Sequence, residues 1–154
     1  MQVKTHGIGY SVFSVKKQAA DVKTAIVYGD NFMENEFVRV AFNENGTFDL
    51  TDKRSGRVYA AQNLFEDTKD CGNLYNYWPV DGDVAVTNAN TKATITLDEV
   101  TPYSVTFKAV IDMAIDADIT TYVTLSDGVA RADIKTVINN RADDHRVRAL
   151  FDSE

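Results

Sequence analysis

The stretch EFVRVAFNENGTFDLT, residues 36–51, decides the fold class of this chain. Apolar and polar residues alternate in residues 36–42 and again in residues 47–51, which is the pattern of strands that place one face on a core. Between them, Asn45-Gly46 is a strong hairpin signal, because a tight turn needs a positive φ that this pair adopts at low cost. The stretch therefore predicts two antiparallel strands joined by a short turn.

The segments that follow continue this pattern. A turn at Ser55-Gly56 starts a third strand, and the second half of the chain holds longer segments that are rich in Val, Ile, Thr and Tyr and contain no internal Pro. These segments are residues 92–100, 103–115, 118–128 and 130–140. Long strands in consecutive hairpins indicate a large antiparallel sheet, and two such sheets packed face to face bury the apolar rows. We therefore predict an all-β fold with two large antiparallel sheets.

The two ends show the same alternation. Residues 9–17 carry apolar side chains on both faces and predict a strand that is partly covered on each side. Residues 24–28 predict a short strand. Residues 142–151 fit a helix or a strand, and their alternation favours a strand.

Composition limits the size and the partners of the protein. A length of 154 residues suits one domain, in which we expect residues 1–30 to form lead-in strands and residues 31–154 the main sandwich. The chain has 16 Lys and Arg against 23 Asp and Glu, a formal charge of −7. This balance argues against nucleic acid and anionic membranes as partners, since both require clustered positive charge. Cys71 has no second cysteine to pair with, and no signal peptide is visible, so we expect a cytoplasmic location.

The loop DCGNLYNYWPVDGD, residues 70–83, combines large aromatic side chains with acidic and turn-forming residues. Aromatic faces stack on the C–H face of a sugar, and a neighbouring amide bonds its hydroxyls, so the loop predicts a carbohydrate site formed by Tyr75, Asn76, Tyr77 and Trp78. On a strand, Tyr75 and Tyr77 would share one face and Asn76 and Trp78 the other. The alternative is that Trp78 and one tyrosine pack on the end of the sandwich.

Catalytic chemistry has little basis in the sequence. The two histidines, His6 and His145, have no second metal ligand at a useful spacing, so no metal site is expected. Glu66, Asp67 and Asp70 are the best placed acids for glycoside hydrolysis, but with 23 acids some pair is always available. Motifs for serine, cysteine or lysine nucleophiles and for phosphate loops are missing. We therefore expect no catalytic residue in this chain.

Three sequence patterns together resemble a known family. The run N-E-x-x-x-V-x-x-N-x-x-G-(T/S)-x-x-L-x-D-K-x-(S/T)-G-x-x-Y is matched by residues 35–59, an F-E-D block by residues 65–67, and G-(D/N)-x-Y-x-(Y/F)-x-P by residues 72–79. Residues 137–151 resemble an N-x-x-x-D-H-R-(L/V)-R strand. With these patterns the chain resembles the region beyond the catalytic barrel in glycoside hydrolase family 38, the α-mannosidases, and in particular their bacterial branch.

The resemblance implies a galactose-mutarotase-like supersandwich that follows the barrel. In the family the barrel holds a zinc ion and an aspartate nucleophile, partly through an H-x-D motif that this chain lacks. Zinc is therefore expected in the parent's barrel and no cofactor in this chain. Tyr75 matches the tyrosine that reaches toward the sugar pocket, whereas Trp78 departs from the small residue usual at its position. Arg141, His145 and Arg146 lie in the D-H-R strand, and no role follows for them.

The resemblance and the loop together define the expected function. We expect the non-catalytic β-domain of a metal-dependent retaining α-mannosidase, which shapes one wall of the sugar pocket and is inactive alone. Its partners would be mannosides, the barrel and later β-domains of the same chain. One alternative is a stand-alone carbohydrate-binding module with Tyr75, Tyr77 and Trp78 as its platform. Another is a structural sandwich whose exposed apolar faces pack on sister domains.

Overall fold

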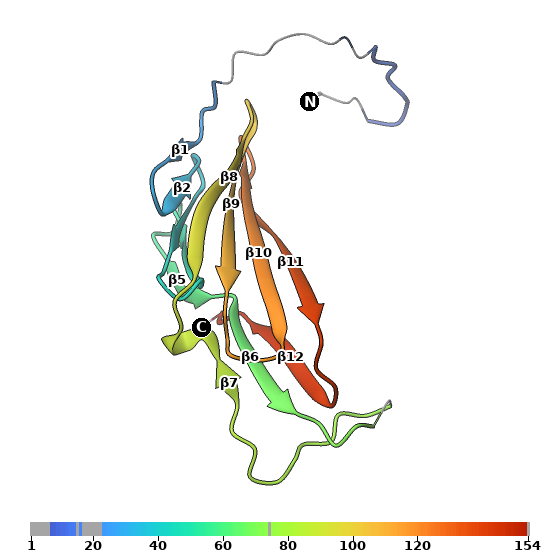
Figure 1. Cartoon of the computed structure of the whole chain (residues 1–154). Helices are drawn as coiled ribbons and strands as arrows, with labels where there is room; N and C mark the ends of the chain where they lie inside the picture. The colour runs from blue at the N-terminus through green and yellow to red at the C-terminus, as the bar shows by residue number, and fades with distance from the viewer. Residues whose placement is uncertain (1–6, 15, 17–22, 74, 154) are drawn as a thin grey trace.

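Antiparallel strands build almost all of the regular structure in the computed structural model, which describes residues 7–14, 16, 23–73 and 75–153 (Figure 1). Within these residues, the helical structure is one 3₁₀ turn, η1 (Asn88–Asn90). The predicted all-β class is therefore confirmed. Among the described residues, no helix has the length and apolar character needed to cross a membrane.

The strands of the described residues form three antiparallel sheets. The five-stranded sheet runs in chain order through β1 (Val27–Tyr28), β2 (Phe32–Glu34), β3 (Val38–Phe42), β4 (Phe48–Asp52) and β5 (Val58–Gln62). The four-stranded sheet has the order β11 (Ala132–Asn140), β10 (Ala117–Ser126), β9 (Ser104–Ile111) and β8 (Thr94–Val100). The three-stranded sheet has the order β12 (His145–Leu150), β6 (Leu64–Lys69) and β7 (Val86–Thr87).

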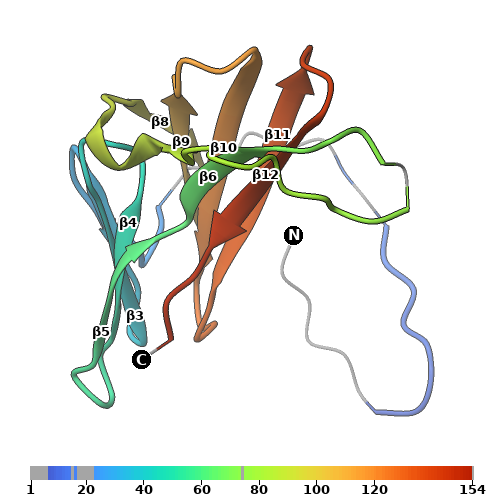
Figure 2. The same cartoon turned by 90° about the horizontal axis from the view of Figure 1, so that it is seen from below.

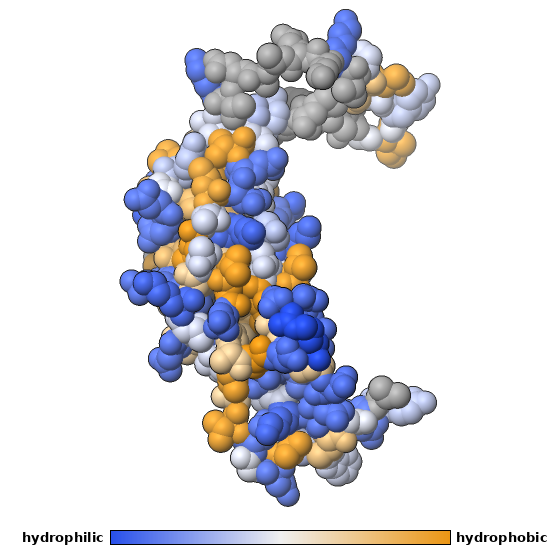
Figure 3. Space-filling view, viewed as in Figure 1, coloured by the Kyte–Doolittle hydropathy of each residue, from blue (hydrophilic) through white to orange (hydrophobic). Residues whose placement is uncertain are grey.

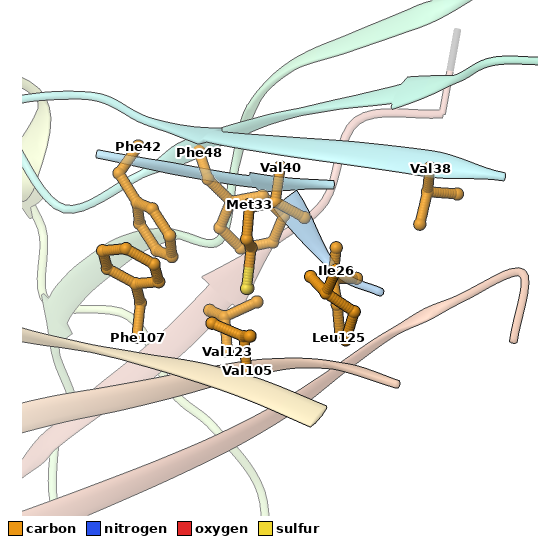
Figure 4. Close-up of a cluster of buried hydrophobic side chains, with 10 residues drawn as sticks. All are labelled: Ile26, Met33, Val38, Val40, Phe42, Phe48, Val105, Phe107, Val123 and Leu125. Atoms are coloured by element: carbon orange, nitrogen blue, oxygen red, sulfur yellow. The ribbon is translucent and has the colours of Figure 1, made fainter. Parts of the chain in front are cut away.

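The main core lies between the five-stranded and four-stranded sheets (Figure 4). Side chains from the two sheets point toward one another, and the rings of Phe42 and Phe107 meet across the interface with their centroids 5.2 Å apart. The fully enclosed members from the two sheets are Met33, Val40, Val105, Phe107, Val123 and Leu125. This arrangement is the sandwich that the alternation predicted, because each strand buries one of its two faces.

The three-stranded sheet packs on the part of the four-stranded sheet that the main core does not cover. Figure 2 shows its paired strands β6 and β12 near one end of the four-stranded sheet. Phe65 of β6 is buried in a second cluster with Ile111, Met113 and Ile119. This sheet was not expected as a separate layer. It carries the aromatic loop, since that loop connects β6 to β7.

Asn35 joins the two halves of the sandwich. Its side-chain nitrogen donates to the carbonyl oxygens of Ser126 and Val129, each at 2.8 Å. Its side-chain oxygen accepts the backbone N–H groups of Phe37 and Val38, each at 2.9 Å. The first residue of the 35–59 pattern therefore ties the start of β3 to the turn between β10 and β11.

Several expected elements differ from the structure. Residues 9–14 and 16 form no strand and are exposed, while residues 15 and 17 lie outside the described residues, as does His6. The expected strand over residues 24–28 is reduced to β1, and the one over 103–115 ends at Ile111. Alternation alone predicts a strand, but a strand forms only where a neighbouring strand supplies hydrogen bonds. Residues 9–14 have no such neighbour in the described sheets.

Candidate functional site

The loop after β6 is closed at its base by hydrogen bonds of backbone groups to one another and to the side chain of Asp70. The carboxylate of Asp70 accepts the N–H groups of Gly72 and Trp78, each at 3.3 Å. The N–H of Cys71 donates to the carbonyl of Trp78 at 2.9 Å, and Asp70 forms a β-bridge with Pro79. These contacts hold the two arms of the loop together, with Tyr75 near its tip.

Tyr77 packs on the sheet instead of facing solvent. It is half-buried, its hydroxyl donates to Thr68 Oγ1 at 3.2 Å, and the guanidinium carbon of Arg146 lies 3.3 Å from the centre of its ring. Thr68 and Arg146 are directly paired residues of β6 and β12, so they share one face of the three-stranded sheet. That face is opposite to the one that carries Phe65, because Phe65 and Thr68 are three residues apart on the same strand.

Tyr75, Asn76 and Trp78 project from the loop. The side chain of Tyr75 is 94% exposed and that of Trp78 is 63% exposed, and Asn76 is exposed as well. Trp78 is therefore too exposed for the packing alternative, and Tyr77 packs on the outer face of the three-stranded sheet and not on the end of the sandwich. The expected sharing of faces is wrong too, because these residues form no strand, so Tyr75 and Tyr77 have different surroundings. A binding role for the four residues stays a prediction.

The D-H-R residues lie beside the base of the loop. The carbonyl of Asp144 accepts the N–H of Asp70 at 2.8 Å. Gly72 has φ 79°, and a Cβ added there would come within 2.6 Å of Asp144 Oδ1, so the loop passes close against this residue. Asp144, in the D-H-R pattern, therefore supports the base of the aromatic loop.

His145 links β6 to the end of β11. Its Nδ1 lies 2.6 Å from Asp67 Oδ1 and its Nε2 lies 2.8 Å from Asn140 Oδ1. The amide of Asn140 is oriented by two bonds to the backbone of Ala142, so its oxygen faces the imidazole. Each nitrogen of the imidazole therefore has a side-chain oxygen as its partner.

The three acids considered for glycoside hydrolysis all have structural partners. Glu66 pairs with Arg148, Asp67 with His145, and Asp70 with backbone N–H groups. Arg141 bonds two carboxylates, and its guanidinium lowers the pKa of Asp118 below the ordinary value. The described residues include no group of three or more His, Cys, Asp or Glu that fits a metal ion.

Two hollows flank the loop. One of about 190 Å³ is lined by Asp70, Gly72, Asn73, Asp144 and His145. The other, of about 390 Å³, lies beside Asp67 and Lys69 and is closed by residues 80–84 and Val86. The smaller hollow is mainly polar, the larger one is also lined by three valines, and both are open to solvent. The aromatic loop, with the D-H-R residues beneath it, is thus the candidate site. Sequence reasoning missed the contribution of Arg146, because its contact with Tyr77 depends on the pairing of β6 with β12.

Comparison with known proteins gives a consistent assignment, although no family model matches. A curated protein from Halalkalibacterium halodurans, called a putative mannosylglycerate hydrolase, is 27% identical in a match that covers 80% of this chain and 17% of the relative. The crystal structure of an α-mannosidase from Enterococcus faecalis V583 matches with a TM-score of 0.75 and 28% identity over 84% of this chain and 18% of that one. A second structure, of a glycosyl hydrolase family 38 protein from Enterococcus faecalis, has a TM-score of 0.77 and 27% identity over 89% and 20%.

The fold and these similarities define an all-β segment related to the glycoside hydrolases. More particularly, the predicted resemblance to glycoside hydrolase family 38 is confirmed. The chain spans about a fifth of the length of the relatives it matches.

Proposed function

We propose that this chain is the non-catalytic β-domain of a metal-dependent retaining α-mannosidase, in which it shapes one wall of the sugar pocket. The proposal rests on the relatives, two of which are described as an α-mannosidase and a family 38 glycosyl hydrolase. Their greater length leaves room for a separate catalytic barrel. That barrel would supply the carboxylate nucleophile, the general acid and the zinc ion, since the described residues of this chain offer no fitting metal ligands.

Within this chain, the exposure of Tyr75 is the observation that supports a role in the wall of the sugar pocket. Its side chain is 94% exposed although the loop around it is held by Asp70 and Tyr77. A large aromatic group that is exposed on a fixed support suits stacking against a sugar ring, because little conformational freedom is lost on binding. Trp78 and Asn76 would extend this wall with a second ring and an amide.

Two measurements test the proposal. Purified chain should not hydrolyse nitrophenyl α-mannoside, with or without added zinc, because the three acids best placed for this chemistry, Glu66, Asp67 and Asp70, have structural partners. Sequencing the coding region around the codon for Met1 should reveal an adjoining barrel with an H-x-D motif. Turnover above the blank, or a coding region without such a barrel, would overturn the proposal.

A stand-alone carbohydrate-binding module is the second candidate, and the 63% exposure of Trp78 favours it. Titration with mannose and manno-oligosaccharides, followed by Trp78 fluorescence, separates the two. Saturable quenching of the wild type at millimolar or tighter affinity would indicate a complete binding site, provided that Tyr75→Ala abolishes it. A flat signal would indicate that the loop needs the rest of the parent's pocket.

A further inference from the structure

We propose that Arg146 is a positioning residue that orders the aromatic loop by stacking on Tyr77. This inference deepens the proposed function, since it assigns the residue that sets the wall of the sugar pocket. Its first consequence, the order of the loop, can be measured without any sugar.

The contact between Arg146 and Tyr77 is close and shielded. The guanidinium carbon lies 3.3 Å from the centre of the ring, and both residues are half-buried. Nε of Arg146 is buried and has no hydrogen-bond partner. An unpaired buried N–H is costly, so the aromatic face is the interaction that compensates this group. Cation–π contacts strengthen as water is excluded, and here both residues are half-buried.

The support beneath the stack is rigid. Arg146 pairs with Thr68 across β12 and β6, and Thr68 also accepts the hydroxyl bond from Tyr77. Tyr77 is thereby held from its ring face and from its hydroxyl by two adjacent strands. The loop has no other side chain that is held in this way among its described residues 70–73 and 75–83.

Fixing Tyr77 restricts its neighbours on both sides. Trp78 follows directly, and its N–H already bonds Asp70. Tyr75 precedes Tyr77 by two residues and its own N–H bonds the side chain of Asn73. The stack therefore reduces the conformations that the two exposed rings sample before a ligand arrives, which raises affinity by preorganisation.

Arg148 provides a matched comparison. It lies on the same strand and the same face as Arg146, but its guanidinium pairs with Glu66 and contacts no residue of the loop in the described structure. Replacing either arginine by methionine removes one positive charge and keeps a long apolar side chain. A difference between the two variants therefore reports the stack on Tyr77 and not the loss of charge.

The test uses Trp78, the single tryptophan of the chain, as an internal probe of the loop. Arg146→Met should increase acrylamide quenching of Trp78 and lower its fluorescence anisotropy, with the loop-opening equilibrium rising about fivefold or more, the factor expected for a shielded cation–π contact. Arg148→Met should leave both signals at their wild-type values. If Arg146→Met also leaves them unchanged, the proposal is wrong.

A second variant keeps the test decisive if Arg146→Met fails to fold. Tyr77→Leu removes the ring from the other side of the contact and should by itself increase acrylamide quenching of Trp78, so unchanged quenching in this variant would contradict the proposal. Where both single variants fold, the double variant should be no more mobile at Trp78 than either single one. Additive effects would contradict a direct coupling. Loop disorder in Arg146→Met combined with turnover of nitrophenyl α-mannoside by the chain alone would overturn the proposed function but leave the positioning role intact.

Discussion

Gly46 occupies a position that a side chain can enter only by displacing a neighbour. Its φ is 85°, and an added Cβ would lie 2.7 Å from Cγ1 of Ile111. Gly46→Ala therefore combines left-handed backbone strain with overpacking, and we expect a loss of about 2–4 kcal/mol in the free energy of unfolding. Urea denaturation measures this loss.

Gly128 separates the two causes. Its φ is 70°, but nothing lies within 4 Å of an added Cβ. Gly128→Ala should therefore cost about 1 kcal/mol, the strain alone. Equal losses in the two variants would show that contact with Ile111 contributes nothing.

Glu34 makes stability depend on pH in the acidic range. A hydrogen bond from Lys53, with a second from Arg39, holds the pKa of Glu34 below its ordinary value of 4.5, in spite of partial burial. A carboxylate with a lowered folded-state pKa stabilises the protein above its unfolded pKa, and this contribution is lost as the pH falls through the folded-state pKa.

Glu34→Gln should be less stable than the wild type at pH 7 by less than about 1 kcal/mol, since the pair is near the surface. The difference should shrink as the pH is lowered from 4.5 through the folded-state pKa. Urea midpoints measured across this range give the result. Glu36→Gln, at an exposed site in the same stretch, is the control, and a difference that grows in acid would contradict the assignment.

Individual residues were predicted unevenly from the sequence. The hairpin at Asn45-Gly46 is present, but only Gly46 of this pair has a positive φ. Tyr75 and Trp78 are exposed as a binding surface requires, whereas Tyr77 is not. The sequence shows the types of side chain, but the contact that buries Tyr77 comes from a strand about 70 residues later, which local spacing cannot indicate.

Among the connections between elements, the Asn35 side chain makes four hydrogen bonds to backbone groups, one of them buried and three partly buried. Asn35→Ala would leave two carbonyls and two N–H groups without their partners, at a cost of about 3–5 kcal/mol. Asn31→Ala removes a single side-chain bond, to Phe42 at 3.3 Å, and should cost about 1 kcal/mol.

Thermal or urea unfolding compares these two variants. Amide hydrogen exchange of Asn35→Ala should also accelerate at Phe37 and Val38, whose N–H groups the side chain protects. Unchanged exchange at both residues would show that another acceptor takes over.

Strands with long alternating patterns were found near their predicted positions, in particular β3, β4, β8, β10 and β11. The missed strands β2, β6 and β7 are short or lie in sequences with mixed polarity, such as LFEDTK in β6. β6 is a strand because β12 and β7 pair with it, and because Phe65 enters the second core. Tertiary pairing of this kind overrides a weak local pattern.

At the scale of the whole molecule, the inner face of β11 is an apolar surface that is exposed to solvent. The register places Ile134 and Ile138 opposite the buried Val123 and Ile119, yet they are 37% and 41% exposed. The five-stranded and three-stranded sheets that pack on the four-stranded sheet leave β11 almost wholly exposed. Figure 3 shows apolar areas between hydrophilic ones on another face of the molecule.

An apolar sheet edge of this kind promotes self-association of the chain alone. The double variant Ile134→Lys/Ile138→Lys should therefore sediment as a smaller species than the wild type at the same concentration. Val137→Lys is the control, because Val137 is 45% exposed on the opposite face of the same strand. Identical sedimentation of all three proteins would show that β11 is not an association surface.

The joining of β6 to β12 has a consequence for how the protein is made. The bonds from His145 to Asp67 and from Arg148 to Glu66 connect residues 78 and 82 positions apart. During synthesis, the tyrosines and the tryptophan of the loop leave the ribosome long before the strand beneath them has been translated. Contacts so distant along the chain form slowly, so the loop should reach its ordered conformation only after β12 has paired with β6.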